Sequence, residues 1–173
     1  TGTEHLRQVP HGLKAQTRGD EREQAAEISE VVSFAVKLAR AEVRERARLS
    51  SNGEPVRVLF GAVKLCQVLL NLIVNAAQAM EGTGRPGKID VKWGTQDHNV
   101  ILTVTDNGCG IPVELQEKVF QPLFTTKPVG IGTGLGLSIC KELVAQYGGR
   151  LKLSSIPGEG TSIEISLIRA PMP

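Results

Sequence analysis

Two asparagines, Asn71 and Asn75, lie four residues apart in the strongly apolar stretch AVKLCQVLLNLIVNAAQAM. If this stretch is a helix, the spacing puts both amides on one face. A buried amide costs free energy unless it finds partners, so one explanation is two core asparagines that bond to nearby backbone. The other explanation is a pair of neutral oxygen ligands that face a cavity. Hard oxygens of this kind suit Mg²⁺, which also keeps water and phosphate ligands.

Asp106 is followed by glycines two and four positions later, in TVTDNGCGIP. The alternating residues before it predict a strand that ends at Asp106, and Gly108 and Gly110 allow the backbone to approach another group closely. Asp-Asn-Gly is also a common turn sequence, so an ordinary turn is the simpler explanation. A carboxylate at a strand end beside the apolar Ile111 is equally suited to accept a hydrogen bond from the exocyclic amino group of a nucleobase. The loss of such a bond costs about 1–3 kcal/mol.

Alternate glycines at positions 130, 132, 134 and 136 lead into the helical stretch KELVAQY. They do not match the dinucleotide pattern G-x-G-x-x-G, and the P-loop pattern G-x-x-x-x-G-K-[ST] does not occur in the sequence. Backbone N–H groups at a helix N-terminus nevertheless favour anions by roughly 0.3–1 kcal/mol per contact. Lys127 adds a positive charge just before the glycines. The glycines alone are compatible with phosphate binding or with simple flexibility.

Hydrophobic periodicity predicts the helices that must position these residues. They cover residues 29 to about 45 with Ser29 as N-cap, 62–80, a short helix that Pro112 opens (113–120), and 136–147 with Gly148 and Gly149 as its C-cap. Residues 20–27 read as a linker, and 121–132, with two prolines and two glycines, read as a mobile loop.

Alternation of apolar and polar residues predicts three pairs of strands. They are RLSSNGEPVRVLF around a turn at Asn52-Gly53, GKIDVKWGT with NVILTVTD as a hairpin, and RLKLSSI with GTSIEISLI around a turn at 157–160. Helices and strand pairs alternate along the chain. This order predicts an α/β two-layer sandwich, in which helices cover one face of a mixed, mainly antiparallel sheet.

Composition excludes several classes of protein. The 173 residues carry 20 basic and 18 acidic side chains, a balance that gives no reason to expect nucleic acid. The three cysteines form no C-x-x-C pair, and the three histidines lack partners at metal-ligand spacing, which argues against a disulfide framework or a zinc site. We find no signal peptide and no apolar run long enough to span a bilayer, and therefore expect a cytoplasmic segment without membrane contact.

Together the motifs are far more specific than any one of them. In the order N-x-x-x-N, D-x-G-x-G, F-x-P-L-F, G-x-G-x-G and G-E-G-T, the sequence resembles the catalytic ATP-binding domain of sensor histidine kinases. This is the Bergerat-type fold, shared with gyrase, heat-shock chaperones and mismatch-repair ATPases. The matched residues are Asn71, Asn75, Asp106, Gly108, Gly110, Phe120, Phe124, Gly132, Gly134, Gly136, Gly158, Gly160 and Thr161. The resemblance covers residues 29 to about 168.

The resemblance implies ATP and Mg²⁺ as ligands and a mobile lid, formed by residues 121–133. Asp106 would accept from the adenine amino group, with help from Thr161 and Gly110. Asn75 would coordinate Mg²⁺, and Asn71 would contact the phosphates or the waters of the metal. The wider nucleotide site would comprise Gly108, Ile111, Phe124, Thr125, Thr126, Lys127, Gly132, Thr133, Gly134, Leu135, Gly136 and Leu137. Val74, Ile111 and Ile163 are candidates for the apolar walls around the base.

One departure concerns the basic residue that many histidine kinases carry three positions after the metal-binding Asn. Here that residue is Gln78, and "NAAQAM" with "FTTK" resembles the subgroup related to nitrogen-regulation kinases. In that subgroup the Lys of FTTK, here Lys127, supplies the positive charge for the phosphates. We therefore expect Asn71, Asn75 and Lys127 to carry the catalytic role.

Transfer is favoured over hydrolysis in this sequence. Hydrolytic members of the superfamily have a Glu four residues before the metal-binding Asn, where it acts as general base. This chain has Asn71 there, and an amide cannot take a proton. In the kinases the acceptor is a His on a dimerising helical hairpin, but neither His5 nor His11 lies in an H-E-[LIF] box. Two alternatives stay open: a Bergerat-fold serine kinase of the anti-sigma-factor type, and a nucleotide-binding module without transferase activity.

The expected organisation has two parts. Residues 1–28 resemble the end of the hairpin helix and its linker, and residues 29–173 form the catalytic ATP-binding domain. The expected partners are ATP and ADP, a phosphoacceptor histidine domain outside this chain, and a response-regulator receiver domain reached through the full kinase. Dimerisation would come from the hairpin, which leaves open whether this piece is monomeric and whether its parent is membrane-anchored.

Overall fold

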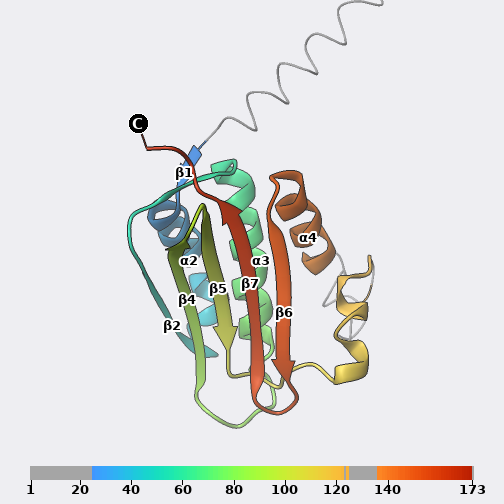
Figure 1. Cartoon of the computed structure of the whole chain (residues 1–173). Helices are drawn as coiled ribbons and strands as arrows, with labels where there is room; N and C mark the ends of the chain where they lie inside the picture. The colour runs from blue at the N-terminus through green and yellow to red at the C-terminus, as the bar shows by residue number, and fades with distance from the viewer. Residues whose placement is uncertain (1–24, 123, 125–135, 173) are drawn as a thin grey trace, which may run out of the picture.

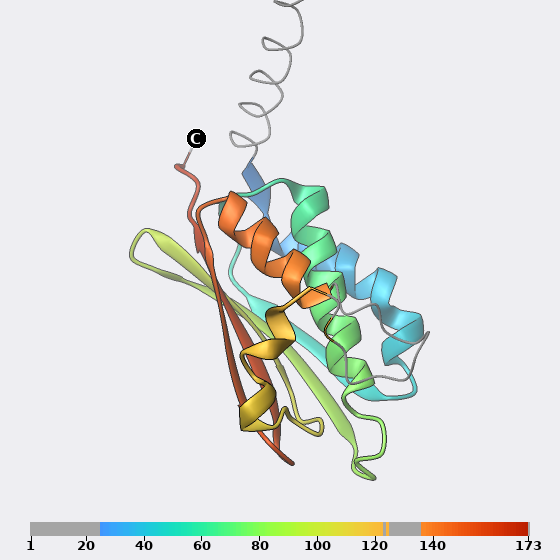
Figure 2. The same ribbon diagram turned by 90° about the vertical axis from the view of Figure 1, so that its right-hand side faces the viewer.

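The fold is known from a computed structural model that describes residues 25–122, 124 and 136–172. A five-stranded sheet forms one layer, and three α-helices form the other (Figures 1 and 2). Figure 2 shows all three helices on the same side of the sheet. The predicted α/β two-layer sandwich, with a mixed and mainly antiparallel sheet, is therefore confirmed.

The strands of the main sheet follow the spatial order β2-β4-β5-β7-β6. The pairing of β2 with β4 is parallel, whereas the other three pairings are antiparallel. The strand bounds are Ala47–Gly53 for β2, Gly87–Gln96 for β4, Asn99–Asp106 for β5, Arg150–Ile156 for β6 and Gly160–Ile168 for β7. Both predicted hairpins, β4–β5 and β6–β7, are present.

The helices are α2 (Ile28–Val43), α3 (Ala62–Gln78) and α4 (Gly136–Gln146). The short helix expected after Pro112 consists instead of two 3₁₀ turns, η1 (Val113–Leu115) and η2 (Lys118–Phe120). In the part of the chain that the structure describes, none of the helices has the length and apolar character needed to cross a bilayer.

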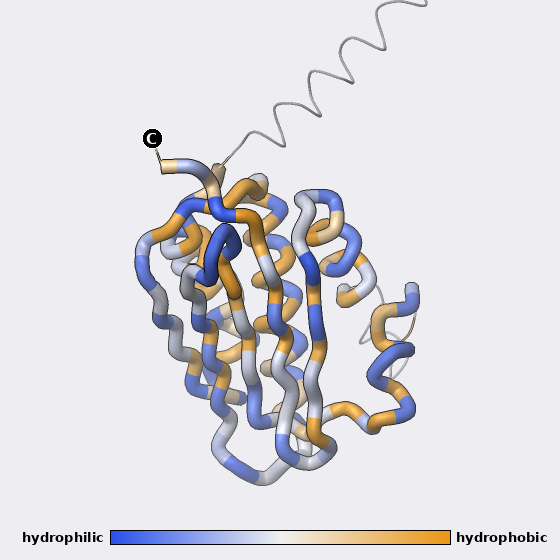
Figure 3. Tube along the Cα trace, viewed as in Figure 1, coloured by the Kyte–Doolittle hydropathy of each residue, from blue (hydrophilic) through white to orange (hydrophobic). Residues whose placement is uncertain are grey.

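The hydrophobic core lies between the helices and the sheet and is largely aliphatic. Along the strands in Figure 3, apolar and polar positions alternate, as expected for a sheet with one buried face. Among the described helices, α3 has the most buried residues, and Leu65, Val68, Leu69, Leu72 and Ile73 are nearly inaccessible to solvent. Their partners on the sheet are Ile89, Val91, Leu102, Val104 and Ile165. The packing of α3 on the sheet thus fixes where its polar face can lie.

The predicted pairing of the two strands around Asn52-Gly53 is wrong. The β2 strand runs through Gly53 and pairs with β4, while β3 (Arg57–Leu59) pairs with β1 (Ala25–Glu27) in a separate two-stranded sheet. Gly53 lies opposite Trp93, and a Cβ atom at Gly53 would collide with the indole ring. The glycine is thus explained by the close approach of a large side chain rather than by a turn.

The start of the first helix also differs from the prediction. Ser29 was expected as N-cap, but Glu27 occupies that position, and its carboxylate accepts from the backbone N–H groups of Ser29 (3.2 Å) and Glu30 (3.0 Å). The same carboxylate accepts from the N–H of Val56 at 3.2 Å. Residues 25–27, expected as linker, form β1. The division into residues 1–28 and 29–173 stays a prediction, and residues 1–24 lie outside the described part of the chain.

Glu27 gives a stability prediction with a defined pH dependence. Desolvation raises the pKa of its carboxyl, but the hydrogen bonds from Ser29, Glu30 and Val56 together outweigh it, so that the net pKa is lowered. A lowered folded-state pKa means that the carboxylate stabilises the fold above the unfolded pKa of about 4.3, and that this contribution is lost as the pH falls through the folded value.

We expect Glu27→Ala to lower the free energy of unfolding by about 1–2 kcal/mol at neutral pH, as other N-cap losses do. Glu30→Ala is the matched control, because its side chain lies in the same turn and caps nothing that the structure describes. Denaturant titrations at several pH values measure both effects. Glu27→Gln keeps the shape of the side chain and removes its charge, so its loss of unfolding free energy relative to the wild-type chain should shrink as the pH falls. A loss that stays constant to pH values well below the unfolded pKa would contradict a capping role of the carboxylate.

Candidate functional site

The first asparagine of the pair, Asn71, connects α3 to α4. Its amide nitrogen donates to the sulfur of Cys140 at 3.9 Å, and the Cys140 thiol donates to the carbonyl of Val68 at 3.8 Å. Cys140 is completely buried, and this burial raises the pKa of the Cys140 thiol to about 11. The thiol is therefore protonated at neutral pH. It acts at once as a donor to one turn of α3 and as an acceptor for the next.

The second asparagine, Asn75, lies beside the start of α4. A Cβ atom placed on Gly136, the first residue of that helix, would lie 3.7 Å from the Asn75 amide nitrogen. Both asparagines are only partly buried, as is Val74, whereas Leu72 and Ile73 between them are buried. The predicted common face of Asn71 and Asn75 is thus the face of α3 that meets α4.

Asp106 is the last residue of β5 and pairs across the sheet with Thr161, near the start of β7. Its carboxylate accepts from the backbone N–H of Gly108 at 2.8 Å and from that of Thr161. Desolvation raises the pKa of the Asp106 carboxyl, and the two backbone hydrogen bonds oppose that shift. The ionised form is consequently disfavoured in the free protein, which costs stability at neutral pH that is recovered as the pH falls through the raised pKa.

The backbone around Asp106 approaches other segments of the same chain so closely that glycine is required at two positions. Gly110 has φ +71°, and a Cβ atom there would collide with the carbonyl oxygen of Ile156. Gly160 has φ +143°, and a Cβ atom there would collide with the carbonyl oxygen of Asp106. Both glycines therefore let the loop after β5 pack directly on the β6–β7 hairpin.

The side chain of Arg85 also joins the loop after β5 to the β6–β7 turn. Its guanidinium donates to three backbone carbonyls: Nε to Asn107 at 2.9 Å, and Nη2 to Gly108 at 2.7 Å and to Gly158 at 2.8 Å. The first two carbonyls follow Asp106, and the third lies in the turn before Thr161. One side chain from the segment after α3 thus bridges the two loops next to the carboxylate.

A second network lies around Ser155 on β6. The Ser155 hydroxyl oxygen accepts from the N–H of Ile111 at 2.8 Å and also contacts the Gly160 carbonyl (3.0 Å) and the Thr161 hydroxyl (2.9 Å). The amide of Gln116 donates to the carbonyls of Ile111 at 2.9 Å and Ser155 at 3.0 Å. These bonds fix the position of Ile111, which was predicted as a wall of the base site.

The loop after Asp106 contacts the C-terminal end of α3, the helix that carries the two asparagines. The N–H of Cys109 donates to the carbonyl of Ala79 at 2.9 Å, and Ala79 lies one helical turn after Asn75. The structure therefore places Asn75, Asp106, Gly108, Gly110, Ile111, Gly136 and Thr161 toward one end of the sheet and helix layers, with Asn71 one helical turn earlier on α3. Such an arrangement offers a partly buried acceptor at one side and amides beside a helix N-terminus at the other.

Other predicted site residues have different positions. Ile163 is part of the hydrophobic core, with 7% of its surface exposed, and Leu137 packs against that core. Phe124 is partly buried, and the ring of Phe120 lies 5.0 Å from the ammonium group of Lys141 on α4. Thr125, Thr126, Lys127, Gly132, Thr133, Gly134 and Leu135 lie outside the described residues, so their roles stay predictions.

Sequence reasoning missed Arg85, Ser155 and Gln116. Ser155 could have been found from the hairpin register, since a turn at 157–159 places it opposite Thr161. Arg85 and Gln116 lie in segments without periodicity, and their partners are backbone carbonyls that are distant in the sequence. No sequence pattern indicates such contacts.

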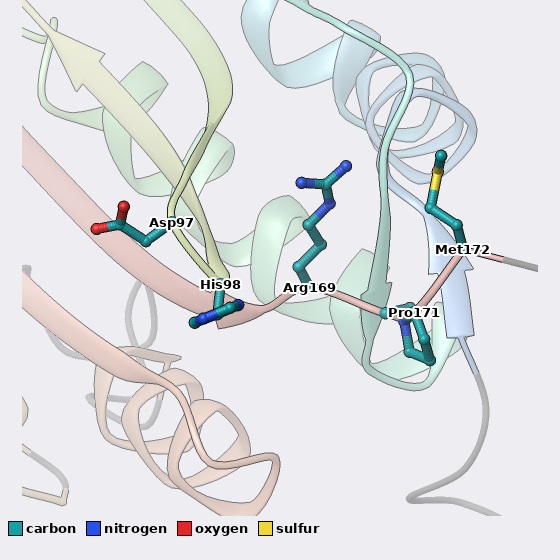
Figure 4. Close-up of a pocket in the computed structure, with 6 residues that line it drawn as sticks. Asp97, His98, Arg169, Pro171 and Met172 are labelled. Atoms are coloured by element: carbon teal, nitrogen blue, oxygen red, sulfur yellow. The ribbon is translucent and has the colours of Figure 1, made fainter.

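A separate surface hollow of about 420 Å³ lies at the opposite end of β5, before its first residue (Figure 4). Its labelled side chains spread apart in Figure 4 and do not converge on a common point. It is lined by Asp97, His98, Arg169, Ala170, Pro171 and Met172, and no predicted site residue is among them. The hollow is therefore distinct from the site around Asp106.

Comparison with known proteins agrees with this geometry. The family model for histidine kinase-, DNA gyrase B- and HSP90-like ATPases matches residues 61–171. The sensor histidine kinase ZraS of Salmonella typhi is 37% identical over 150 residues, covering 83% of this chain and 31% of the relative. The histidine-protein kinase AtoS of Escherichia coli K12 is 40% identical over 104 residues, covering 60% of this chain and 16% of the relative. The chain thus spans about a third or less of the length of these curated relatives.

Solved structures match over nearly their full length. The mycobacterial sensor histidine kinase MprB aligns with a TM-score of 0.74 at 29% identity, covering 86% of this chain and 99% of that structure. The catalytic domain of the histidine kinase ThkA aligns with a TM-score of 0.72 at 31% identity, covering 86% of this chain and 99% of that domain. The chain therefore belongs to the family of histidine kinase-, DNA gyrase B- and HSP90-like ATPases, and within it to the catalytic ATP-binding domains of histidine kinases.

Proposed function

We propose that this chain binds Mg·ATP at the site around Asp106 and Asn75 and transfers the γ-phosphoryl group to a histidine on a phosphoacceptor domain. In that step a histidine nitrogen forms the new bond to phosphorus and gives up its proton. The bond between the γ-phosphorus and the bridging oxygen breaks, and ADP leaves. Phosphoryl transfer needs positioning and charge neutralisation more than covalent work by the protein, and the proposed residues are suited to both.

The observation that carries this proposal is the environment of Asp106. Its carboxylate is desolvated at a strand end and is held by two backbone N–H groups. Among the described residues, no cation forms an ion pair with Asp106. A charge that costs stability and is nevertheless held in a fixed position is typical of a recognition site. Its chemistry suits the exocyclic amino group of adenine.

The chemistry of the donor set fits Mg²⁺. Asn75 provides a neutral hard oxygen near the start of α4, and Mg²⁺ commonly combines one or two protein ligands with substrate phosphates and water. Among the described residues, no three acidic, histidine or cysteine side chains cluster in a way that would hold a metal ion without the nucleotide. In this proposal Asn75 holds the ion together with the phosphates, and a bound Mg²⁺ neutralises their charge.

Asn71 supports transfer over hydrolysis. The position where hydrolytic relatives have a general base is an amide here, and that amide is hydrogen-bonded to the neutral thiol of Cys140. Neither group can take a proton from an attacking water at neutral pH. In our proposal the phosphorylated acceptor passes its phosphoryl group to a response-regulator receiver domain through the full kinase. In our proposal the domain works in the cytoplasm, where ATP is available.

Replacement of Asp106 tests base recognition. Asp106→Asn keeps the shape of the side chain but replaces one acceptor oxygen by an amide N–H₂, which cannot accept from the exocyclic amino group of adenine. We expect the dissociation constant for ATP to rise roughly 5- to 150-fold, the equivalent of about 1–3 kcal/mol. The change removes a desolvated charge and also places an amide N–H₂ near a backbone N–H. These effects oppose each other, so we expect the melting temperature to change by no more than about 4 °C. Unchanged ATP affinity in calorimetric titrations would contradict the role.

Replacement of Arg85 tests the bridge between the two loops. Arg85→Ala removes three hydrogen bonds to backbone carbonyls, and Arg85 itself is not a predicted contact of the nucleotide. We expect ATP and GTP to lose affinity by the same factor, about 3- to 10-fold, because loosened loops bind any base less well. Arg57→Ala is the matched control, since within residues 25–122, 124 and 136–172 that side chain makes a single hydrogen bond, a long one of 3.4 Å to the carbonyl of Ala25. A selective loss of one nucleotide would contradict a purely positioning role.

Phosphotransfer in trans tests the activity itself. The chain is incubated with γ-labelled ATP and Mg²⁺, alone and with the dimerising hairpin of one of the sensor histidine kinases that it resembles. We expect acid-labile label on the hairpin only. Label should be absent with Asn75→Ala and absent when the acceptor histidine of the hairpin is replaced by Gln. Strong acid-labile label on the chain itself would contradict an external acceptor.

The same assay separates the two alternatives. Acid-stable label on a serine of a supplied protein would favour a serine kinase. ATP binding without any transfer would favour a nucleotide-binding module.

A further inference from the structure

The hydroxyl of Ser155 has three polar partners and a single hydrogen to share among them. The partners are the N–H of Ile111 (2.8 Å), the carbonyl oxygen of Gly160 (3.0 Å) and the hydroxyl oxygen of Thr161 (2.9 Å). A serine hydroxyl can donate one hydrogen bond and accept two. All three contacts are therefore satisfied only if the donor and the acceptor in each contact are fixed.

Only one assignment of hydrogens meets this condition. The N–H of Ile111 can only donate, so Ser155 accepts there. The carbonyl of Gly160 can only accept, so Ser155 uses its one hydrogen there. The remaining contact must then be an acceptance, which means that Thr161 donates its hydroxyl hydrogen to Ser155. Thr161 is left with lone pairs and no hydrogen for any other partner.

The neighbours of Ser155 hold this arrangement in place. Gln116 bridges the carbonyls of Ile111 and Ser155, at 2.9 Å and 3.0 Å, and so ties the loop after β5 to β6. On the next strand, Thr161 is fixed by its pairing with Asp106 and by the bond from its N–H to the Asp106 carboxylate. If the Thr161 hydroxyl turned away, Ser155 would lose the donor to its second lone pair; if Ser155 donated to Thr161 instead, the Gly160 carbonyl would lose the Ser155 hydrogen.

We propose that Ser155 is a specificity-determining residue, which makes the Thr161 hydroxyl an obligate acceptor in the base site. This inference rests on the proposed binding of a nucleotide around Asp106 and names the feature of the base that is read. With the Asp106 carboxylate, Thr161 gives the site two acceptors on adjacent strands. A purine with an exocyclic amino group at position 6 meets them as a donor, directly or through a water. A purine with a carbonyl oxygen there meets two acceptors and is rejected.

The role of Ser155 differs from that of a residue that only supports the loop. Loss of support weakens the binding of every base by a common factor, as expected for Arg85. Without Ser155, by contrast, the Thr161 hydroxyl can rotate and donate to the carbonyl oxygen at position 6 of a purine. The preference between bases then changes. The ratio of the GTP and ATP dissociation constants is thus the quantity that separates the two roles.

The experiment measures ATP and GTP binding by calorimetric titration of the chain and its variants with Mg²⁺ present. We expect Ser155→Ala to narrow the GTP/ATP ratio by about 3- to 10-fold. Ser155→Thr, which keeps the hydroxyl, should retain most of the preference. Ser154→Ala is the matched control, since that serine lies on the same strand, faces the opposite side and is exposed. It should leave the ratio unchanged.

A second variant covers the case in which Ser155→Ala does not fold. Thr161→Val keeps the shape of the side chain and removes the acceptor, so it should also narrow the ratio by about 3- to 10-fold. If the wild-type chain prefers ATP and neither Ser155→Ala nor Thr161→Val changes the ratio, this inference is overturned and the proposed function stands. If the wild-type chain binds neither nucleotide, the proposed function fails, and the inference fails with it.

Discussion

The register between β5 and β7 is the constraint on which the site depends. It places Asp106 opposite Thr161 and brings the Asp106 carbonyl against Gly160. A slip by one residue would turn every side chain of one strand to the other face. The apolar residues that precede Asp106 on β5 prevent such a slip, since Val100, Leu102 and Val104 must all face the helices. The hydrophobic pattern of a strand thus determines the position of a carboxylate at its end.

The α3 helix transmits the same kind of constraint to the other half of the site. Its apolar face packs on the sheet so completely that the rotation of the helix about its axis is fixed. Asn71 and Asn75 must therefore face α4, where the Cys140 thiol and Gly136 lie. At the end of the helix the carbonyl of Ala79 accepts from Cys109, which joins this half to the loop after Asp106. The β5–β7 register and the packing of α3 on the sheet both determine the position of the loop after Asp106, and the candidate site lies around this loop.

Much of this could be predicted from the sequence, because the elements that carry it have clear periodicity. The α3 helix, the hairpins β4–β5 and β6–β7 and the two-layer arrangement all follow from patterns of apolar residues. The register of each hairpin follows from its turn, but the pairing of Asp106 with Thr161 joins β5 to β7, which belong to different hairpins, so that no turn sets it. The partner of β2 could not be predicted either, because Asn52-Gly53 imitates a turn, whereas the glycine is required by the ring of Trp93 in another strand. Glu27 was missed for a similar reason, since its carboxylate also binds Val56, which is 29 residues away.

The division of the site into two halves limits what each half can do. Arg85, Ser155 and Gln116 bond to the backbone and side chains around the base end, so these loops are ordered before any ligand arrives. A pre-ordered base end gains affinity, because little conformational freedom is lost on binding. It cannot distinguish ATP from ADP, since both carry the same base. Any preference between substrate and product must therefore arise at the other half, where Asn75 faces the first residue of α4. In the proposed site, the end that would select the base is thus not the end that would decide when the nucleotide leaves.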